Sequence, residues 1–318
     1  MNNGVRLDPK AVRTFGEKSN LKGGWILLFN WLLIAFAFAL PIISLNAVTV
    51  IVSLVILANR QLGLAILMHE CSHYSLFKTH KLNQVLGQIF CGAPVLADLD
   101  GYRTYHLRHH SEAGTTTDPD YPNYKNYPVT NKSWTRKVIR DFAGITGLKT
   151  LYAILLMNAG VLKYDMSYQS SSADKKLSAF QVFVNLLRNL ALPFIVHLAI
   201  WGALAFLGHG WLYALWWISY FTVYMFIIRV RNAAEHGNVP DLLDKNPLLH
   251  ARTTYASWWE RLTFAPNYVN YHLEHHLRPN IPCYNLKAFH QYLLDEGHLK
   301  EVRVATGYID VMRQLRAV

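Results

Sequence analysis

The chain has 318 residues, of which 52% are hydrophobic and only 16% are charged. An average soluble domain carries about 25% charged residues, and here the apolar residues are also clustered, so the composition excludes an ordinary soluble domain and indicates membrane spans. The formal net charge of +11 does not indicate nucleic-acid binding, because the basic residues flank apolar segments and form no dense patch. Three cysteines without CxxC spacing argue against a disulfide framework and favour a reducing compartment.

Four apolar segments are long enough to cross about 30 Å of hydrocarbon as helices. They cover about residues 24–45, 47–68, 188–207 and 211–228. Asn46 and the Gly208-His209-Gly210 sequence leave room only for tight turns, so we expect two helical hairpins. Arg60 lies within the second segment and is expected to extend to the interface or to pair with an acidic group. The N-terminus lacks the pattern of a secretory signal.

Two further apolar segments are too short to span a bilayer comfortably. Residues 82–97 are interrupted by glycines and a proline, which predicts a re-entrant or interfacial segment. Residues 150–162 predict an interfacial helix, and residues 163–178 predict a solvated loop.

The distribution of basic residues predicts the orientation in the membrane. All Lys and Arg except Arg60 and Arg229 lie in residues 1–23, 70–188 and 231–318. Basic residues favour the cytoplasmic side, so we expect both termini and the regions 1–23, 70–187 and 229–318 to be cytosolic. The expected fold is an all-α integral membrane protein, a single domain over 1–318, with four transmembrane helices in two hairpins and a cytosolic helical cap.

Histidines are concentrated in three short segments of the expected cap. The sequences are His69-Glu-Cys-Ser-His73, His106-Leu-Arg-His-His110 and His272-Leu-Glu-His-His276. Positions i, i+3 and i+4 share one face of a helix, so the imidazoles of each segment can point at one place. Imidazole is a common ligand of iron, copper, zinc and nickel. The candidate ligands are His69, His73, His106, His109, His110, His272, His275 and His276.

A ninth candidate ligand lies just after the fourth apolar segment. His236 lies four residues after Asn232, which places both side chains on one helical face. Asn232 is a candidate for a water-mediated metal contact or, alternatively, for a helix cap. His197 lies within a span and is expected to hydrogen-bond another helix. Carboxylates that could accept the second N–H of a ligating imidazole are Glu70, Glu112, Asp118, Asp120, Glu235 and Glu274.

Nine imidazoles exceed what one ion binds, so the sequence predicts a two-metal centre. Structural zinc prefers four ligands, often with cysteine, whereas clusters of four or five imidazoles suit redox iron; copper stays open on affinity grounds. His69-Glu-Cys-Ser-His73 also matches the HExxH pattern of zinc proteases, which would leave the other histidines unexplained. A metal transporter would place its ligands near the bilayer midplane, whereas here they lie outside the spans.

With these motifs, the chain resembles the membrane fatty acid desaturases. The similarity includes HECSH, HLRHH and HLEHH, the Asn232–His236 segment, and HLEHHLRPNIPCYNL at 272–286, so it covers nearly the whole chain. His272 stands where front-end desaturases usually have Gln, which argues against that subgroup. The resemblance implies an integral protein of a bacterial inner membrane or an ER-type membrane, with its active site facing the cytosol.

The resemblance further implies two iron ions, O2 as co-substrate, and desaturation of a fatty acyl chain held as a membrane lipid or an acyl thioester. Electrons would come from an external donor, cytochrome b5 or ferredoxin with its reductase, because the sequence contains no HPGG haem-binding motif. A hydroxylase or ketolase of acyl chains, sterols or carotenoids on the same scaffold is the alternative, and motif spacing does not decide between them.

Overall fold

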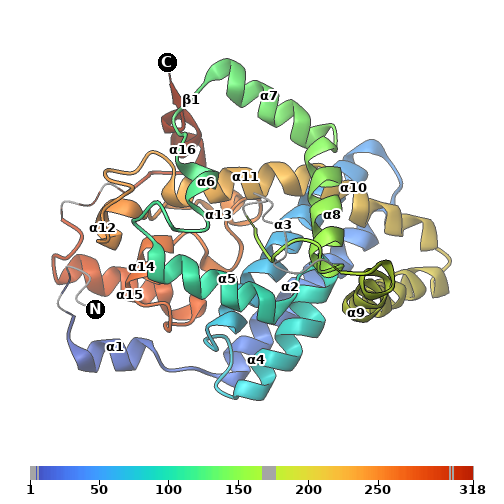
Figure 1. Ribbon diagram of the computed structural model, residues 1–318, viewed down its shortest axis with the longest axis horizontal. Helices are drawn as coiled ribbons and strands as arrows, with labels where there is room; N and C mark the ends of the chain where they lie inside the picture. Colours follow the sequence, from blue (N-terminus) through green and yellow to red (C-terminus); the bar gives the residue numbers. More distant parts are fainter. Residues whose placement is uncertain (1–4, 6, 167–176, 301, 303, 318) are drawn as a thin grey trace.

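The computed structural model describes residues 5, 7–166, 177–300, 302 and 304–317, and its described elements are almost all helical (Figure 1). Strands β1 (Val129–Thr130) and β2 (Arg316–Ala317) form a short parallel pair. The α-helices are α1 Pro9–Phe15, α2 Asn20–Ile43, α3 Ala47–Ser72, α4 His80–Leu86, α5 Leu99–Glu112, α6 Tyr121–Tyr124, α7 Asn131–Phe142, α8 Ile145–Asn158, α9 Ala179–Phe206, α10 Ala214–Phe221, α11 Val223–His236, α12 Pro247–His250, α13 Trp258–Arg261, α14 His272–Leu277, α15 Cys283–Asp295 and α16 Tyr308–Gln314. The other helical turns are η1 Gly87–Gly92, η2 Ala93–Val95, η3 Gly210–Tyr213 and η4 Pro266–Tyr268.

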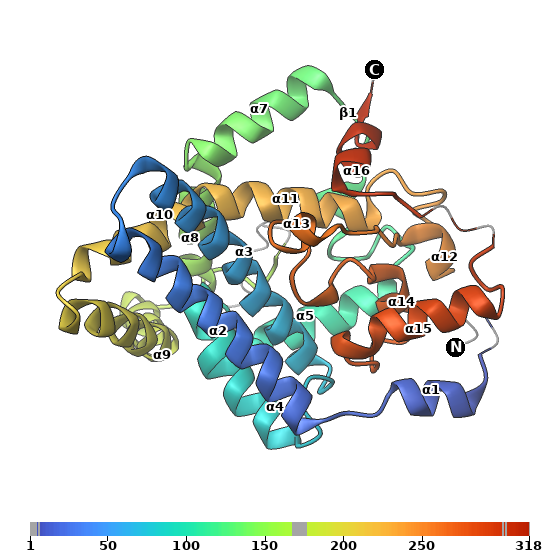
Figure 2. The same cartoon turned by 180° about the vertical axis from the view of Figure 1, so that it is seen from behind.

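The prediction of four membrane-length apolar helices is confirmed, although most extend further than expected. The four candidate spans are Asn20–Ile43, Ala47–Ser72, Ala179–Phe206 and Gly210–His236. The first two pack against each other along their length (Figure 2). Asn46 begins α3 because its side-chain oxygen accepts from the backbone N–H groups of Val48 and Thr49. The hydroxyl of Ser53 donates to the Ala37 carbonyl at 2.7 Å, which joins α2 to α3.

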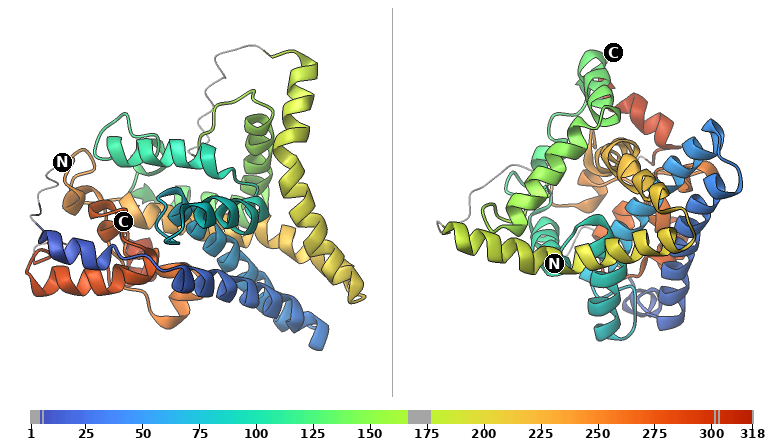
Figure 3. Two further views of the ribbon diagram at one scale, coloured as in Figure 1. Left: turned by 90° about the horizontal axis from the view of Figure 1, so that it is seen from below. Right: turned by 90° about the vertical axis from the view of Figure 1, so that its right-hand side faces the viewer.

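The second pair of spans differs from the first. The fourth span is η3, α10 and α11, interrupted at Thr222, whose φ of −117° and ψ of −86° are not helical. Helix α9 packs mainly against η3, η2 and α8, and it runs at a steep angle to α2 and α3 (Figure 3). His197 on α9 lies 2.9 Å from the Tyr213 hydroxyl of η3, so the expected hydrogen bond to a neighbouring helical segment is present.

The expectation for Arg60 was wrong. Its guanidinium is buried and bonds two asparagine side chains: Nη1 donates to Asn30 Oδ1 at 3.0 Å and Nε donates to Asn59 Oδ1 at 2.8 Å. No carboxylate pairs with it among the residues that the structure describes. Amide oxygens satisfy the buried donors, so the side chain has no need to reach the interface. Asn30 continues the network to Asn267, which binds the Gly63 carbonyl.

The shorter apolar segments form helices that pack beside the spans. Residues 82–97 fall on α4, the π-helical turn η1 and η2, which lie against α3. The segment predicted over 150–162 is helix α8, which begins five residues earlier, at Ile145. Most of the loop predicted over 163–178 falls on residues 167–176, outside the described part of the chain.

Helix α8 lies very close to α10 at Gly147. A Cβ atom at this position would be 2.5 Å from Phe221 Cα and 2.6 Å from its carbonyl oxygen. Gly147 therefore permits the contact between the two helices.

We predict that Gly147→Ala lowers the free energy of unfolding by about 1–3 kcal/mol, because backbone atoms of α10 must move. Gly202→Ala is the matched control, since a Cβ there has no neighbour within 4 Å. Thermal unfolding of both variants in detergent should show a lower Tm for Gly147→Ala alone. Equal effects of the two substitutions would contradict the close packing of α8 and α10.

Candidate metal centre

Nine histidines on or next to four helices converge where the second and fourth spans end. His69 lies in the last turn of α3, and His73 follows its end. The second histidine segment lies on α5, His236 ends α11, and the third segment lies on α14. The structure therefore brings together every histidine that the sequence predicted to be a ligand.

The nine imidazoles form two groups, in each of which one potential ligand atom per residue lies within 4.8 Å of the others. The first group is His69, His73, His106, His110 and His275, and the second is His109, His236, His272 and His276. Each of the two three-histidine segments contributes to both groups. The groups adjoin, since the rings of His110 and His276 are 4.6 Å apart between centroids.

In the first group, His110 is central. Its Nε2 lies 3.0 Å from Nε2 of His106 and 3.0 Å from Nε2 of His275. His69 completes the group, with ring centroids 4.4 Å from those of both His106 and His275. The Nε2 atoms therefore point at a common centre.

In the second group, Nε2 of His236 and Nε2 of His272 are 2.8 Å apart, and those of His109 and His276 are 3.2 Å apart. The outer nitrogens of two of these rings have hydrogen-bond partners: His109 Nδ1 lies 2.8 Å from Asp118 Oδ1, and His236 Nδ1 donates to the His250 carbonyl at 2.7 Å. His272 Nδ1 lies 3.2 Å from Glu235 Oε1 without a hydrogen bond. A hydrogen-bonded acceptor places the proton on Nδ1 and leaves Nε2 free to bind a metal.

The positions of the ring nitrogens in both histidine groups are compatible with a bound metal. A neutral imidazole carries one N–H, so His236, whose Nδ1 donates to a backbone carbonyl, presents a bare lone pair at Nε2, 2.8 Å from Nε2 of His272. In the first group, both ring nitrogens of His69, Nε2 of His73 and Nδ1 of His275 are buried without a hydrogen-bond partner among the described residues. Unsatisfied buried nitrogens are costly unless a cation binds them.

Burial also holds the imidazoles in the form that binds metals. Desolvation, followed by the nearby imidazoles, lowers the pKa well below 6.5 for His106, His110, His272, His275 and His276. For His109 burial acts in the same direction, but the hydrogen bond to Asp118 and the charge of Asp120 raise its pKa. Neutral imidazole is the metal-binding form, so no proton has to leave most of these rings at pH 7.

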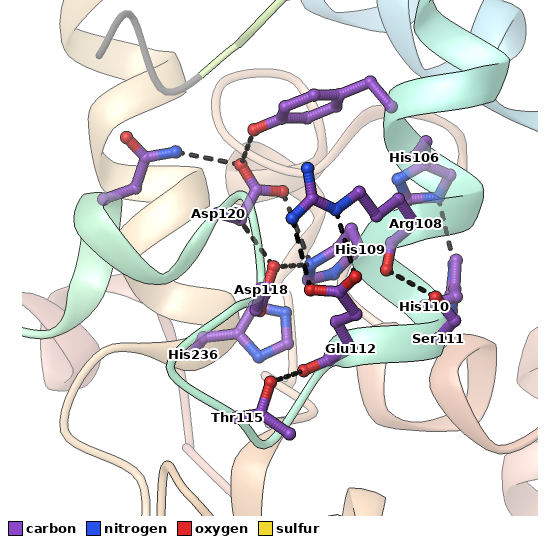
Figure 4. A network of polar contacts seen from close by, with 12 residues as sticks. His106, Arg108, His109, His110, Ser111, Glu112, Thr115, Asp118, Asp120 and His236 are labelled. Carbon is purple, nitrogen blue, oxygen red and sulfur yellow. Dashed lines mark hydrogen bonds and ion pairs between the residues drawn. The ribbon is translucent and has the colours of Figure 1, made fainter. Parts of the chain in front are cut away.

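The candidate carboxylates differ in position. Asp118 contacts His109 directly, whereas Asp120 Oδ2 is 3.6 Å from the same ring and its Oδ1 accepts from Tyr105 and Asn123 (Figure 4). Glu70 Oε1 is 3.3 Å from His69 Nδ1. These three carboxylates, with Glu235, lie beside ligand candidates as expected from the sequence.

Two carboxylates do not contact the histidine groups. Glu274 accepts from His290 Nδ1 at 2.6 Å and from the Thr253 hydroxyl. It lies two residues after His272, which is about 200° around the helix, so it faces away from the metal ligands. Glu112 is paired with Arg108 on the same helix, at 3.1 Å. The expectation that either supports a ligating imidazole was wrong.

Asn232 lies within α11, so the alternative of a helix cap is excluded. It lines a cavity of about 240 Å³ that reaches His106, His109, His236 and His272. Sequence reasoning did not find His250, whose carbonyl fixes His236 and whose ring centroid is 5.5 Å from that of His276. His250 has no histidine three or four residues away, so only the tertiary structure reveals its place.

We predict that Asp118→Asn weakens metal binding by about 10–100-fold. The amide is uncharged, so it holds the N–H at His109 Nδ1 less strongly than the carboxylate of Asp118 does. Glu112→Gln is the control, since its carboxylate contacts Arg108 and not a candidate ligand. Metal retained per chain would be measured against a competing chelator, with circular dichroism to verify folding. Equal retention in the two variants would remove Asp118 from the site.

Comparison with known proteins agrees with this geometry. The fatty acid desaturase family model matches residues 44–306. An sn-1 oleoyl-lipid 12-desaturase of Synechocystis is 29% identical over 249 residues, 75% of this chain and 65% of that protein. Dihydrorhizobitoxine desaturase of Bradyrhizobium elkanii is 26% identical over 76% of this chain and 66% of that protein, and a chloroplastic omega-6 fatty acid desaturase of Arabidopsis thaliana is 26% identical over 80% of this chain and 55% of that protein. The chain thus spans somewhat under two thirds of these relatives' lengths, and it belongs to the fatty acid desaturase family.

Proposed function

We propose that the protein is an oxidoreductase that desaturates a fatty acyl chain, using O2 and two iron ions bound by the two histidine groups. The observation that carries the proposal is the division of nine clustered imidazoles into a group of five and a group of four beside one cavity. Two such irons with O2 would supply an oxidant able to act on an unactivated C–H bond. Each group leaves room for non-protein ligands, and Asn232 is proposed to contact the second metal through water.

The cavity supports an acyl substrate. Its apolar wall comes from α3, η2 and α8, including Leu62, Ile66, Val95 and Ile154. Six tyrosines also line it, together with His106, His109, His236 and His272. An apolar channel that ends at the ligands would align successive CH2 groups with them and exclude water.

The arrangement in the membrane is part of the proposal. Each of the two span pairs is proposed to form a hairpin, and the chain is proposed to act as a single domain over 1–318. The histidine groups lie at the ends of α3 and α11, and the basic residues lie in the regions after them. We therefore place both termini and a helical cap carrying the site in the cytosol, where an external donor, cytochrome b5 or ferredoxin with its reductase, would deliver electrons.

The relatives' names include both oleoyl-lipid desaturases and a dihydrorhizobitoxine desaturase, so they do not restrict the substrate to a lipid. Dihydrorhizobitoxine desaturase matches nearly as well as the oleoyl-lipid enzymes. The apolar wall of the cavity favours an acyl chain, carried by a lipid or a thioester. Hydroxylation or ketone formation begins with the same hydrogen abstraction and differs in the later steps, and the resemblance of the third histidine segment to acyl-lipid desaturases favours the alkene.

The test is lipid analysis of a host that expresses the chain. We expect acyl chains lighter by two hydrogens in the mass spectrum. His276→Ala should abolish this product, because it removes a ligand candidate of the second group. His197→Ala should retain substantial activity, because the ring of His197 bonds the Tyr213 hydroxyl and belongs to neither histidine group.

Both variants must insert into the membrane at the level of the parent protein. Chains heavier by one oxygen, without an unsaturated product, would move the protein to hydroxylation. Loss of activity in His197→Ala but not in His276→Ala would show that the site is misplaced.

A further inference from the structure

Helices α7 and α8 carry a set of exposed apolar and basic side chains that the proposed reaction does not use. On α7 its members are Lys132, Arg136, Ile139 and Phe142; on α8 they are Ile145, Leu148, Lys149, Tyr152 and Leu155. Ile139 is 62% exposed, Leu148 59% and Tyr152 66%. We name these nine residues the α7–α8 face. Helix α7 stands out from the body of the molecule in Figures 1 and 2.

The α7–α8 face combines apolar and basic side chains on one side of each helix. On α8, Ile145, Leu148, Tyr152 and Leu155 recur at spacings of three and four, which is one helical face. On α7, Ile139 and Phe142 are neighbours at i and i+3, and Lys132 and Arg136 lie beside them. Apolar residues flanked by lysine and arginine are the pattern of a helix that lies in a membrane interface.

Helices α7 and α8 carry a strong excess of positive charge. Residues 131–158 contain five basic residues and one acidic residue, Asp141. Asp141 is buried and pairs with Arg229 through two contacts, of 2.5 and 2.7 Å. Its carboxylate is therefore neutralised inside the protein, and Lys132, Arg136 and Lys149 face outward without an acidic residue of their own helices at the surface.

The opposite side of the two helices is fixed to the protein. On α8, Thr150, Ile154 and Met157 line the cavity. Asp141 of α7 also accepts from the Thr146 hydroxyl of α8 at 2.5 Å, which joins both helices to Arg229 of α11. The α7–α8 face is therefore held outward by its own inner contacts.

We propose that the α7–α8 face lies on the membrane surface and binds anionic lipid headgroups. Ile139, Phe142, Ile145 and Leu148 enter the boundary between headgroups and acyl chains, and Lys132, Arg136 and Lys149 bind phosphate groups. The exposed apolar side chains favour this partner over an acidic soluble protein, because a transient charged contact would not require a row of exposed isoleucine, leucine and phenylalanine. The inference does not depend on the reaction proposed above.

The experiment uses a fluorescent label at Ile139→Cys in the full chain, reconstituted in nanodiscs. The three native cysteines are buried, so the introduced thiol is the selective target. Nitroxide lipids carrying the quencher at the headgroup should quench the label. Two labelled controls serve as references: Leu198→Cys on α9 marks a lipid-facing position, and Glu296→Cys after α15 marks a cytosolic position. We expect quenching at 139 well above that at 296 in discs that contain phosphatidylglycerol.

The charge contribution is tested on the same labelled protein. Lys132→Gln with Arg136→Gln should lower the headgroup quenching about twofold in anionic discs and weaken its dependence on lipid charge, since Lys149 alone remains. Lys287→Gln with Lys300→Gln removes the same charge from exposed positions near α15 and should change nothing. Quenching at 139 no greater than at 296 would overturn the proposal. Protection of the label only after addition of an acidic soluble protein would also overturn it and assign the face to that partner.

Discussion

The structure depends on holding nine imidazoles close together in a region where water does not reach most of their ring nitrogens. Buried polar nitrogens without partners are costly, and His69, His73 and His275 each hold at least one. A bound cation would offset that cost by coordination, so the site and the metal would stabilise each other. The ends of α3, α5, α11 and α14 must therefore stay in register, and much of the polar structure around them serves this purpose.

Two buried networks keep these helix ends in place. Arg252 donates to the carbonyls of Ala234, Gly237 and Asn238, which satisfies the end of α11 beside His236. Within the spans, Arg60 and Asn30 bind each other, and Asn30 binds Asn267 a few residues before α14. The first network fixes one ligand directly, and the second connects the membrane helices to the third histidine segment.

The sequence predicted the four apolar helices and all nine histidines of the two groups, because both leave local signals: length and apolar composition for spans, and i, i+3, i+4 spacing for ligands. The sequence could not show which histidine belongs to which group, because His109 and His110 are adjacent in the chain yet belong to different groups. It also misjudged Arg60 and Glu274, whose partners Asn30 and His290 are distant in sequence. The contribution of His250 is a backbone carbonyl, which no side-chain motif records.

The most direct test of the two-metal account is X-ray diffraction from crystals of the purified protein on either side of the iron absorption edge. The account predicts two anomalous peaks, one among His69, His73, His106, His110 and His275, and one among His109, His236, His272 and His276. A single peak in one group, or a signal that appears only at the zinc edge, would contradict it.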